Sequence, residues 1–247
     1  MPAFLSSADS LLAILLALAV IVGVVTKVPS RLWRRTRFHK RRAQSTILDA
    51  LAIGRPLQTV ESTLGQPHLI SRAYERDGAP IEERFYRLPG AWVTVQAPGG
   101  VIAVYTITIT NPKMYYDTGP ATLGAISVRL GRDTFADAPE SPDETFQIYA
   151  RLATFVRYYD YGSTAAGNQY LWLAFNGVGA GTLNGGSRSY ATGRYAESFQ
   201  ADDGDGGPSA DYAATTVNTL TVADFSNHDH MLWRGLQGPH PDELRRG

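Results

Sequence analysis

The sequence predicts an α+β protein, with an N-terminal transmembrane helix followed by an antiparallel-sheet domain. Three observations lead to this prediction. An apolar run lies near the N-terminus, β-branched residues alternate with others in several later segments, and a helical pattern precedes a predicted hairpin at two places. The sequence therefore suggests that the sheet domain contains two repeated helix–hairpin units.

The first 28 residues are predicted to form a retained membrane anchor. Leu11 to Val25 is an apolar run whose helix would rise roughly 22 Å. The hydrocarbon core of a bilayer is about 30 Å thick, and the apolar flanks from Phe4 to Val28 supply the missing length. A cleaved secretory signal is disfavoured because no basic residue precedes the run and no small-residue cleavage site follows it. A buried core helix is the other alternative.

The anchor is followed by a basic juxtamembrane segment, residues 29–44. Residues 27–42 hold eight Lys and Arg and no acid, while no Lys or Arg precedes the apolar run. Because basic flanks stay in the cytoplasm, we expect a single-pass inner-membrane protein with its N-terminus outside and its C-terminal domain cytoplasmic. The lipid bilayer is thus a predicted partner, contacted at its interface by Lys27, Arg31, Trp33, Arg34, Arg35, Arg37, Lys40, Arg41 and Arg42.

The rest of the chain is acidic and lacks cysteine. Residues 43–247 carry 15 basic and 22 acidic side chains, a net charge of about −7, which would repel nucleic acid. We therefore expect no nucleic-acid partner. With no cysteine in the chain, disulfides, a thiolate nucleophile and cysteine-ligated metals are excluded.

Residues 45–112 are predicted to form the first helix–hairpin unit. A helix is expected over 43–52, and a second begins after Pro56, with Leu57, Val60 and Leu64 on one face. Gly65 ends this helix. The segments 83–88, 92–96 and 101–110 are then expected as strands because they are rich in β-branched and aromatic residues.

Residues 113–184 are predicted to form the second unit. A strand is expected over 125–130, and 143–158 is expected to be a helix with Phe146, Tyr149, Leu152 or Ala153, and Val156 facing inward. A hairpin over 159–175 follows. The repeat period of roughly 75 to 90 residues indicates a weak internal duplication.

The remaining segments complete the predicted organisation. Residues 185–216 are rich in Gly, Ser, Ala, Thr and Asp and are expected to form a flexible loop. Residues 217–247 are expected to supply a final strand and a tail.

No set of residues predicts a catalytic, cofactor-binding or metal site. Asp203 and Asp205 have the initial spacing of a calcium loop, but Gly207 and Ala214 stand where later ligands belong. The His228-Asp229-His230 triplet lacks a third ligand nearby. The glycine-rich 177–181 segment lacks the Lys and helix of a phosphate loop.

Aromatic residues are the remaining functional signal. Tyrosine offers a large contact area at little entropic cost, so aromatic clusters often mark binding surfaces. At strand spacing the same residues also form cores and cross-strand pairs. The candidate binding surface consists of Tyr158, Tyr159, Tyr161, Tyr170 and Trp172.

The chain resembles an uncharacterised bacterial family of membrane-anchored proteins named after an enterotoxigenic Escherichia coli locus. After the N-terminal span and basic stretch, the resemblance lies in the Val60/Leu64/Gly65/Pro67 motif and a hairpin turn at Gly99 and Gly100. It continues in Tyr158, Tyr159, Gly162, Gly167, Asn168 and Tyr170, in Asn218 and Thr219, and in Gly238, Pro239, Asp242 and Glu243. That family has no assigned activity, so the resemblance implies only an anchor and a shared fold.

A looser resemblance is to the helix-plus-hairpin repeat of outer-membrane assembly lipoproteins and β-lactamase inhibitor proteins. It rests on the Gly54–Pro67 segment and the hairpin after it. This resemblance implies a protein that binds other proteins and is not an enzyme. It also implies a location outside the cytoplasm, whereas the charge asymmetry predicts the cytoplasmic side.

The expected function is therefore that of a membrane-anchored, non-catalytic interaction module whose partner is another protein. Two alternatives remain. One is an anchored hydrolase using carboxylates such as Glu82 and Asp160, and the other is a cell-envelope assembly factor if the domain lies outside.

Overall fold

The computed structural model describes residues 46–76, 79–141, 143–149, 152–164, 167–184, 190–191 and 212–224. The chain divides into two units, 1–44 and 45–247, and all described residues belong to the second. The predicted anchor, the basic segment with its nine membrane-interface residues, most of the predicted loop and the tail after residue 224 lie outside the described residues. Within the described ranges, no helix has the length and apolar character needed to cross a membrane.

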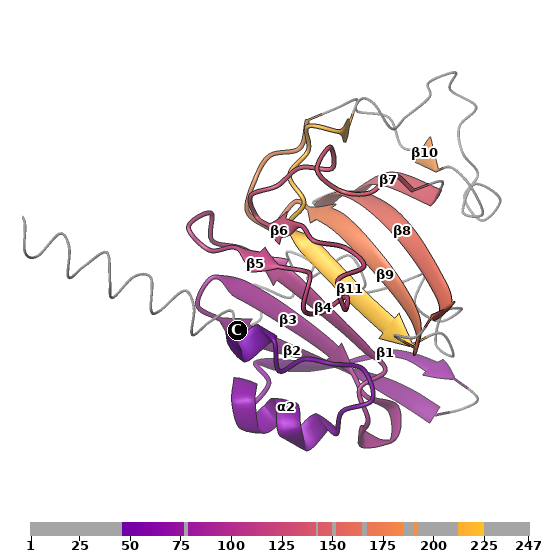
Figure 1. Cartoon of the computed structure of the whole chain (residues 1–247). Helices are drawn as coiled ribbons and strands as arrows, with labels where there is room; N and C mark the ends of the chain where they lie inside the picture. The colour runs from indigo at the N-terminus through magenta and orange to yellow at the C-terminus, as the bar shows by residue number, and fades with distance from the viewer. Residues whose placement is uncertain are drawn as a thin grey trace, which may run out of the picture. The chain divides into compact units, whose positions relative to one another are not determined.

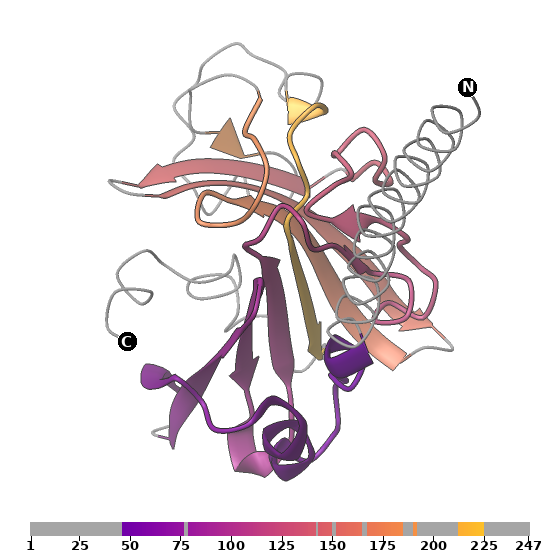
Figure 2. The ribbon, with the colours of Figure 1, turned by 90° about the vertical axis from the view of Figure 1, so that its left-hand side faces the viewer.

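Nine strands form one antiparallel sheet, in the order β1-β2-β3-β4-β11-β9-β8-β7-β10 (Figure 1). Their bounds are β1 Leu69–Arg76, β2 Ala79–Leu88, β3 Ala91–Gln96, β4 Val104–Ile109, β7 Asp143–Tyr149, β8 Leu152–Thr164, β9 Gly167–Asn176, β10 Tyr190–Ala191 and β11 Thr219–Asp224. A separate two-stranded sheet pairs β5 (Tyr116–Asp117) with β6 (Arg129–Leu130). Figure 2 shows β11, in yellow, running between β1–β4 and the orange strands of the second half.

The predicted α+β class is wrong, because the described region is mostly β. The error lies chiefly in 143–158, which forms the antiparallel hairpin β7–β8 instead of a helix, so the predicted second helix–hairpin unit does not exist. Both faces of this hairpin are buried: Phe146 and Phe155 point to one side, Thr145 and Thr154 to the other. A strand buried on both faces has no polar/apolar alternation to distinguish it from a helix.

The predicted helix after Pro56 is confirmed as α2, Leu57–Leu64. Pro56 is extended and precedes the first turn, and Gly65 ends the helix with φ of 84°. Leu57 and Val60 are buried. The remaining described helical residues are a turn at 46–48, Tyr212 and a short 3-10 helix, Pro98–Gly100.

The main hydrophobic core lies on one face of the sheet. It consists of alternate strand residues such as Val93, Ile107 and Leu220, which are fully buried. α2, the 46–51 turn and the covering segment, which we define as residues 111–141, contribute further members of this core. Successive strand residues point to opposite faces, so the remaining strand residues form a second, different face.

Candidate binding face

The second face carries a lattice of threonine and aromatic side chains, here called the threonine face. Strand register aligns one residue from each of six adjacent strands in a row: Thr94, Thr106, Thr221, Trp172, Tyr158 and Asp143. The row beside it contains Trp92, Thr108, Thr219, Ala174, Val156 and Thr145. A third row contains Gln96, Val104, Ala223, Tyr170 and Asp160.

Two pairs of threonine hydroxyls join β4 to β11 across this face. The hydroxyl oxygens of Thr106 and Thr221 are 2.8 Å apart, and those of Thr108 and Thr219 are 3.0 Å apart. All four residues are buried. Each pair satisfies hydrogen bonds that burial removes from water, so these threonines stabilise the centre of the sheet.

Three other hydroxyls on the threonine face are buried and have no hydrogen-bond partner among the residues that the structure describes. They belong to Thr94, Thr145 and Thr154, which are 4%, 1% and 0% exposed. A buried hydroxyl without a hydrogen bond costs about 1–3 kcal/mol. Valine has nearly the same shape and would avoid this cost, so these threonines are not explained by stability.

The structure divides four of the five predicted surface aromatics between the two faces. Tyr158, Tyr170 and Trp172 lie together on the threonine face: the Trp172 ring is 6.2 Å from each tyrosine ring, edge-on to Tyr158 and stacked with Tyr170. Tyr159 points into the main core, where its hydroxyl donates to the Pro139 carbonyl at 2.7 Å. Tyr161 belongs to β8, and its side chain lies outside the described residues.

One end of the face carries a buried carboxylate. Gln96 Nε2 donates to Glu83 Oε1 at 2.7 Å, and both residues are buried. This hydrogen bond links directly opposed residues of β2 and β3. The threonine face therefore combines hydroxyl, amide and carboxylate groups with aromatic rings.

The two carboxylates of the hydrolase alternative do not converge. Glu82 lies on β2 and Asp160 on β8, five strands apart in the sheet. Register also places them on opposite faces, because Glu83 opposes Gln96 on the threonine face while Asp160 opposes Tyr170 there. No cluster of three or more potential metal-ligating side chains occurs among the residues that the structure describes.

The glycine-rich turn after β9 packs against the residues that lead into β11. A side chain at Gly179 would place its Cβ 2.4 Å from the Asn218 amide nitrogen, and one at Gly181 would lie 2.5 Å from Thr216. The backbone N–H of Gly179 donates to the Asn176 carbonyl. These glycines therefore permit close packing against the residues that precede the central strand, and the Gly179 amide is used within the turn.

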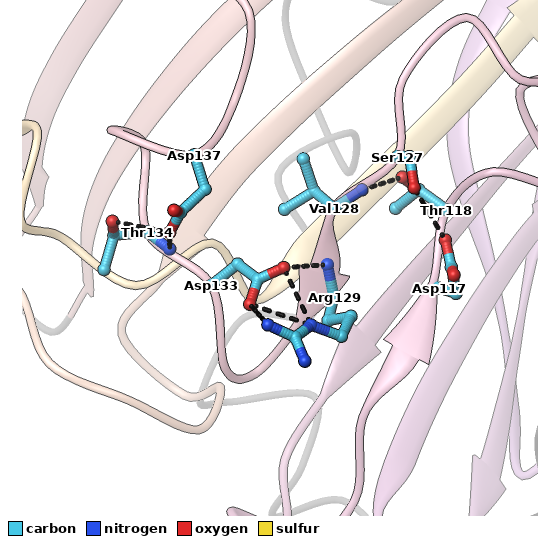
Figure 3. A network of polar contacts seen from close by, with 8 residues as sticks. All are labelled: Asp117, Thr118, Ser127, Val128, Arg129, Asp133, Thr134 and Asp137. Atoms are coloured by element: carbon cyan, nitrogen blue, oxygen red, sulfur yellow. Dashed lines mark hydrogen bonds and ion pairs between the residues drawn. The ribbon is translucent and has the colours of Figure 1, made fainter.

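The covering segment is held by an exposed polar network (Figure 3). The Asp133 carboxylate accepts from the Arg129 backbone N–H at 2.8 Å and from its guanidinium at 2.7 Å. Burial opposes ionisation of Asp133, but the hydrogen bonds and charge of Arg129 outweigh it and lower the pKa of this carboxyl. Thr134 donates to Asp137 from both its backbone and its hydroxyl.

A buried ion pair lies beneath the covering segment, on the main-core side. Arg157 Nε donates to Glu144 Oε1 at 2.5 Å, and both side chains are almost fully buried. The Arg157 guanidinium also donates to the Phe135 carbonyl at 2.7 Å. The ion pair thus joins β7 to β8, and the Arg157–Phe135 hydrogen bond ties this hairpin to the covering segment.

Sequence analysis missed the threonines as functional candidates. Their signal was present, since Thr106 and Thr108 alternate in one strand and Thr219 and Thr221 in another. We interpreted this alternation only as β propensity, because the register that aligns the two strands is not visible in the sequence.

No family model and no curated protein matches the chain. Among solved structures, a cysteine-rich secretory protein from Staphylococcus aureus Mu50 aligns at 10% identity and a TM-score of 0.36, over 72% of this chain and 47% of its own. An extracellular SCP-domain protein from Bacillus anthracis Ames aligns at 12% identity and 0.36, over 79% and 54%. The chain thus spans about half the length of these two proteins.

A third similar structure is a protein described as a putative β-lactamase inhibitor, from Streptococcus mutans. It aligns at 9% identity and a TM-score of 0.23, over 56% of this chain and 83% of its own. At this TM-score the likeness carries no argument for the looser resemblance of the sequence, and no family model supports the resemblance to the enterotoxigenic Escherichia coli family.

Proposed function

We propose that this chain is a single-pass, membrane-anchored protein whose β domain is a non-catalytic module for binding another protein. The supporting observation is the threonine face, which keeps three buried hydroxyls without partners beside a Tyr and Trp cluster. Buried groups that reduce stability are expected where a partner hydrogen-bonds them.

The hydrolase alternative lacks such support. Its candidate carboxylates, Glu82 and Asp160, lie on opposite faces of the sheet, so they cannot act on one bond. The other alternative, an envelope assembly factor, depends on which side of the membrane holds the domain. We propose the cytoplasmic side, on the asymmetry of basic residues around the apolar run.

Partner capture with a matched variant tests the binding face. Chemical crosslinking in intact membranes would be followed by purification and mass spectrometry, comparing the native chain with a Thr94→Val/Thr145→Val/Thr154→Val variant. We expect one protein to be captured by the native chain and at least about tenfold less by the variant, since each lost charge-neutral hydrogen bond contributes about 0.5–1.5 kcal/mol.

The same variant carries its own control. Removal of unpartnered hydroxyls leaves no new cavity, so the variant should unfold at the same or a higher denaturant concentration than the native chain. Equal capture by the two chains, or no reproducible partner with either, would contradict the proposal.

Topology is tested by single-cysteine labelling. Because the chain has no native cysteine, only the introduced thiol can be labelled. Lys113→Cys places a thiol in an exposed turn of the β domain. With the domain in the cytoplasm, a membrane-impermeant maleimide labels it only after lysis. Labelling of intact cells would instead favour the envelope-assembly alternative.

A further inference from the structure

Leu123 combines two features that are unfavourable for a leucine. Among the residues that the structure describes, it is the only one other than glycine with a positive φ, 53°. A β-carbon disfavours this left-handed conformation, which glycine and asparagine adopt more easily. The side chain is also 65% exposed, so its apolar surface stays in contact with water. Neither feature stabilises the folded domain, so stability does not explain a leucine at this position.

The loop around Leu123, residues 118–128, holds this conformation in place. The hydroxyls of Thr118 and Thr122 both donate to the Ile126 carbonyl at 2.8 Å, and both threonines are buried. Ile126 itself belongs to the main core. Backbone strain persists only where the surrounding structure fixes it, as these contacts do here. The loop therefore presents the exposed leucine in one defined position.

The exposed surface of this loop is uncharged. Residues 118–128 contain no Asp, Glu, Lys, Arg or His. The exposed residues are Pro120, Leu123, Gly124, Ala125 and Ser127. A protein interface has a polar rim around its apolar centre, and Ser127 is the one exposed polar side chain that this loop supplies. The loop can enter the interface of a bilayer without taking a charged side chain out of water, which would be expensive.

The loop lies on the same side of the sheet as the first described segment of the β domain. The 46–51 turn contributes Leu48 to the main core, and the loop contributes Ile126 to the same core. Asp49 of this turn lies beside Tyr116, near the base of the loop. Burial, the charge of Asp49 and the hydrogen bond between the two side chains raise the pKa of the Tyr116 hydroxyl. In the proposed anchored chain, this is the side from which the domain is tethered.

We propose that Leu123 is a second membrane contact, inserted into the headgroup region of the bilayer that holds the anchor. The inference rests on the anchor of the proposed function. A single leucine would hold a free domain on a membrane only weakly. A tether makes the contact intramolecular, at an effective concentration of roughly the millimolar range, so that a weak contact is sufficient to orient the domain. Because the contact is apolar, it does not require anionic lipid.

Lipid-dependent quenching in the full chain tests this contact. Leu123→Cys would be labelled with a nitrobenzoxadiazole probe, and the chain would be reconstituted in phosphatidylcholine vesicles with and without nitroxide-bearing lipid. Ile70→Cys and Val101→Cys are matched controls, because these apolar side chains are 49% and 45% exposed and lie outside the loop. We expect the nitroxide to quench the probe at position 123 and to leave the probes at positions 70 and 101 unchanged.

The vesicles distinguish failure of the inference from failure of the anchor. If the chain floats with the vesicles but position 123 is not quenched, or all three positions are quenched equally, the anchor stands and the inference is overturned. A probe at position 123 that is shielded from water but not quenched would place Leu123 in a protein pocket, which also overturns it. A chain that does not float with the vesicles would overturn the proposed anchor and this inference with it.

Leu123→Asn separates membrane contact from a structural role. Asparagine tolerates a positive φ, so this variant should unfold at the same or a higher denaturant concentration than the native chain. A probe on Ala125→Cys, in the same loop, reports the contact, and its nitroxide quenching should be lost when Leu123→Asn is added. Unchanged quenching, or a variant that unfolds more easily than the native chain, would overturn the inference.

Discussion

The two faces of the nine-stranded sheet are buried to a similar degree but by different chemistry. The main-core face is aliphatic and aromatic, and it is packed against α2 and the covering segment. The threonine face has equally buried hydroxyls. Two pairs of them are hydrogen-bonded to each other, and three others have no hydrogen-bond partner among the described residues. The difference shows that burial alone does not identify a structural core. The main-core face also has one buried hydroxyl without a partner in the described part of the chain, that of Tyr86, so the two faces differ in how many such groups they hold. The face with more side chains that are costly to bury is the better candidate for function.

The largest effect is expected from the buried ion pair on the main-core side. Arg157→Leu leaves the Glu144 carboxylate buried without its ion-pair partner, which should lower the free energy of unfolding by about 3–5 kcal/mol. Urea unfolding measures this loss. The double variant Arg157→Leu/Glu144→Leu should recover most of it. If the double variant is as unstable as the single one, the buried charge is not the cause.

A smaller loss of stability is expected where the glycine-rich turn packs against the residues that lead into β11, the central strand of the sheet. Gly179→Ala places a Cβ 2.4 Å from the Asn218 amide, so Asn218 must move, at a cost of about 1–3 kcal/mol. The midpoint of thermal unfolding measures this loss of stability. Gly100→Ala is the matched control, since its Cβ would meet nothing within 4 Å and only its φ of 80° is unfavourable. Gly179 has no positive φ, so the absence of any loss there would show that Asn218 moves aside at no cost.

Neighbouring residues on β3 allow the faces to be compared directly. Val93→Thr introduces an unpartnered hydroxyl into the main core and should cost about 1–3 kcal/mol. Thr94→Val removes such a hydroxyl and should leave stability unchanged or raise it by about 1 kcal/mol. Both values come from denaturant midpoints at a constant m-value. A loss of stability in Thr94→Val would mean that this hydroxyl has a structural role.

The smallest effect is expected at the exposed margin of the covering segment and depends on pH. Because the folded-state pKa of Asp133 is lowered, its contribution to stability is present above its unfolded pKa of about 3.9 and is lost as pH falls through the folded value. Asp133→Asn should therefore differ from the native chain at pH 7 and converge with it in acid. Unfolding measured at pH 7 and pH 3 tests this. A difference that is constant with pH would exclude ionisation as its source.

Secondary structure could be predicted from the sequence where local signals were strong. Pro56, the spacing of Leu57 and Val60, and Gly65 correctly predicted α2, and β-branched runs correctly predicted the strands around Val95 and Ile107. The hairpin β7–β8 was missed because Phe146 and Val156 also fit a helical period, while the tertiary environment buried both faces. Thr145 and Thr154 were an available clue, since threonine is less favoured in helices than in strands.

The candidate site was less predictable than the fold. Three of the five predicted aromatics share the threonine face, but Tyr159 points to the opposite side because alternation along β8 separates it from Tyr158. The threonine lattice requires pairing between β4 and β11, whose paired residues Thr106 and Thr221 are 115 positions apart in the sequence. No local pattern specifies such a pairing, which depends on the register of the assembled sheet.

The central position of β11 also constrains how the protein is made. β1–β4 and β7–β9 can each pair with sequence neighbours as they leave the ribosome, but the strand that joins them is synthesised after both. Until residue 224 has emerged, β4 and β9 each lack the neighbour that pairs with them in the finished sheet. Unpaired strand edges invite association between nascent chains. A translational pause just before residue 219 would therefore prolong the period in which this chain is most prone to aggregate.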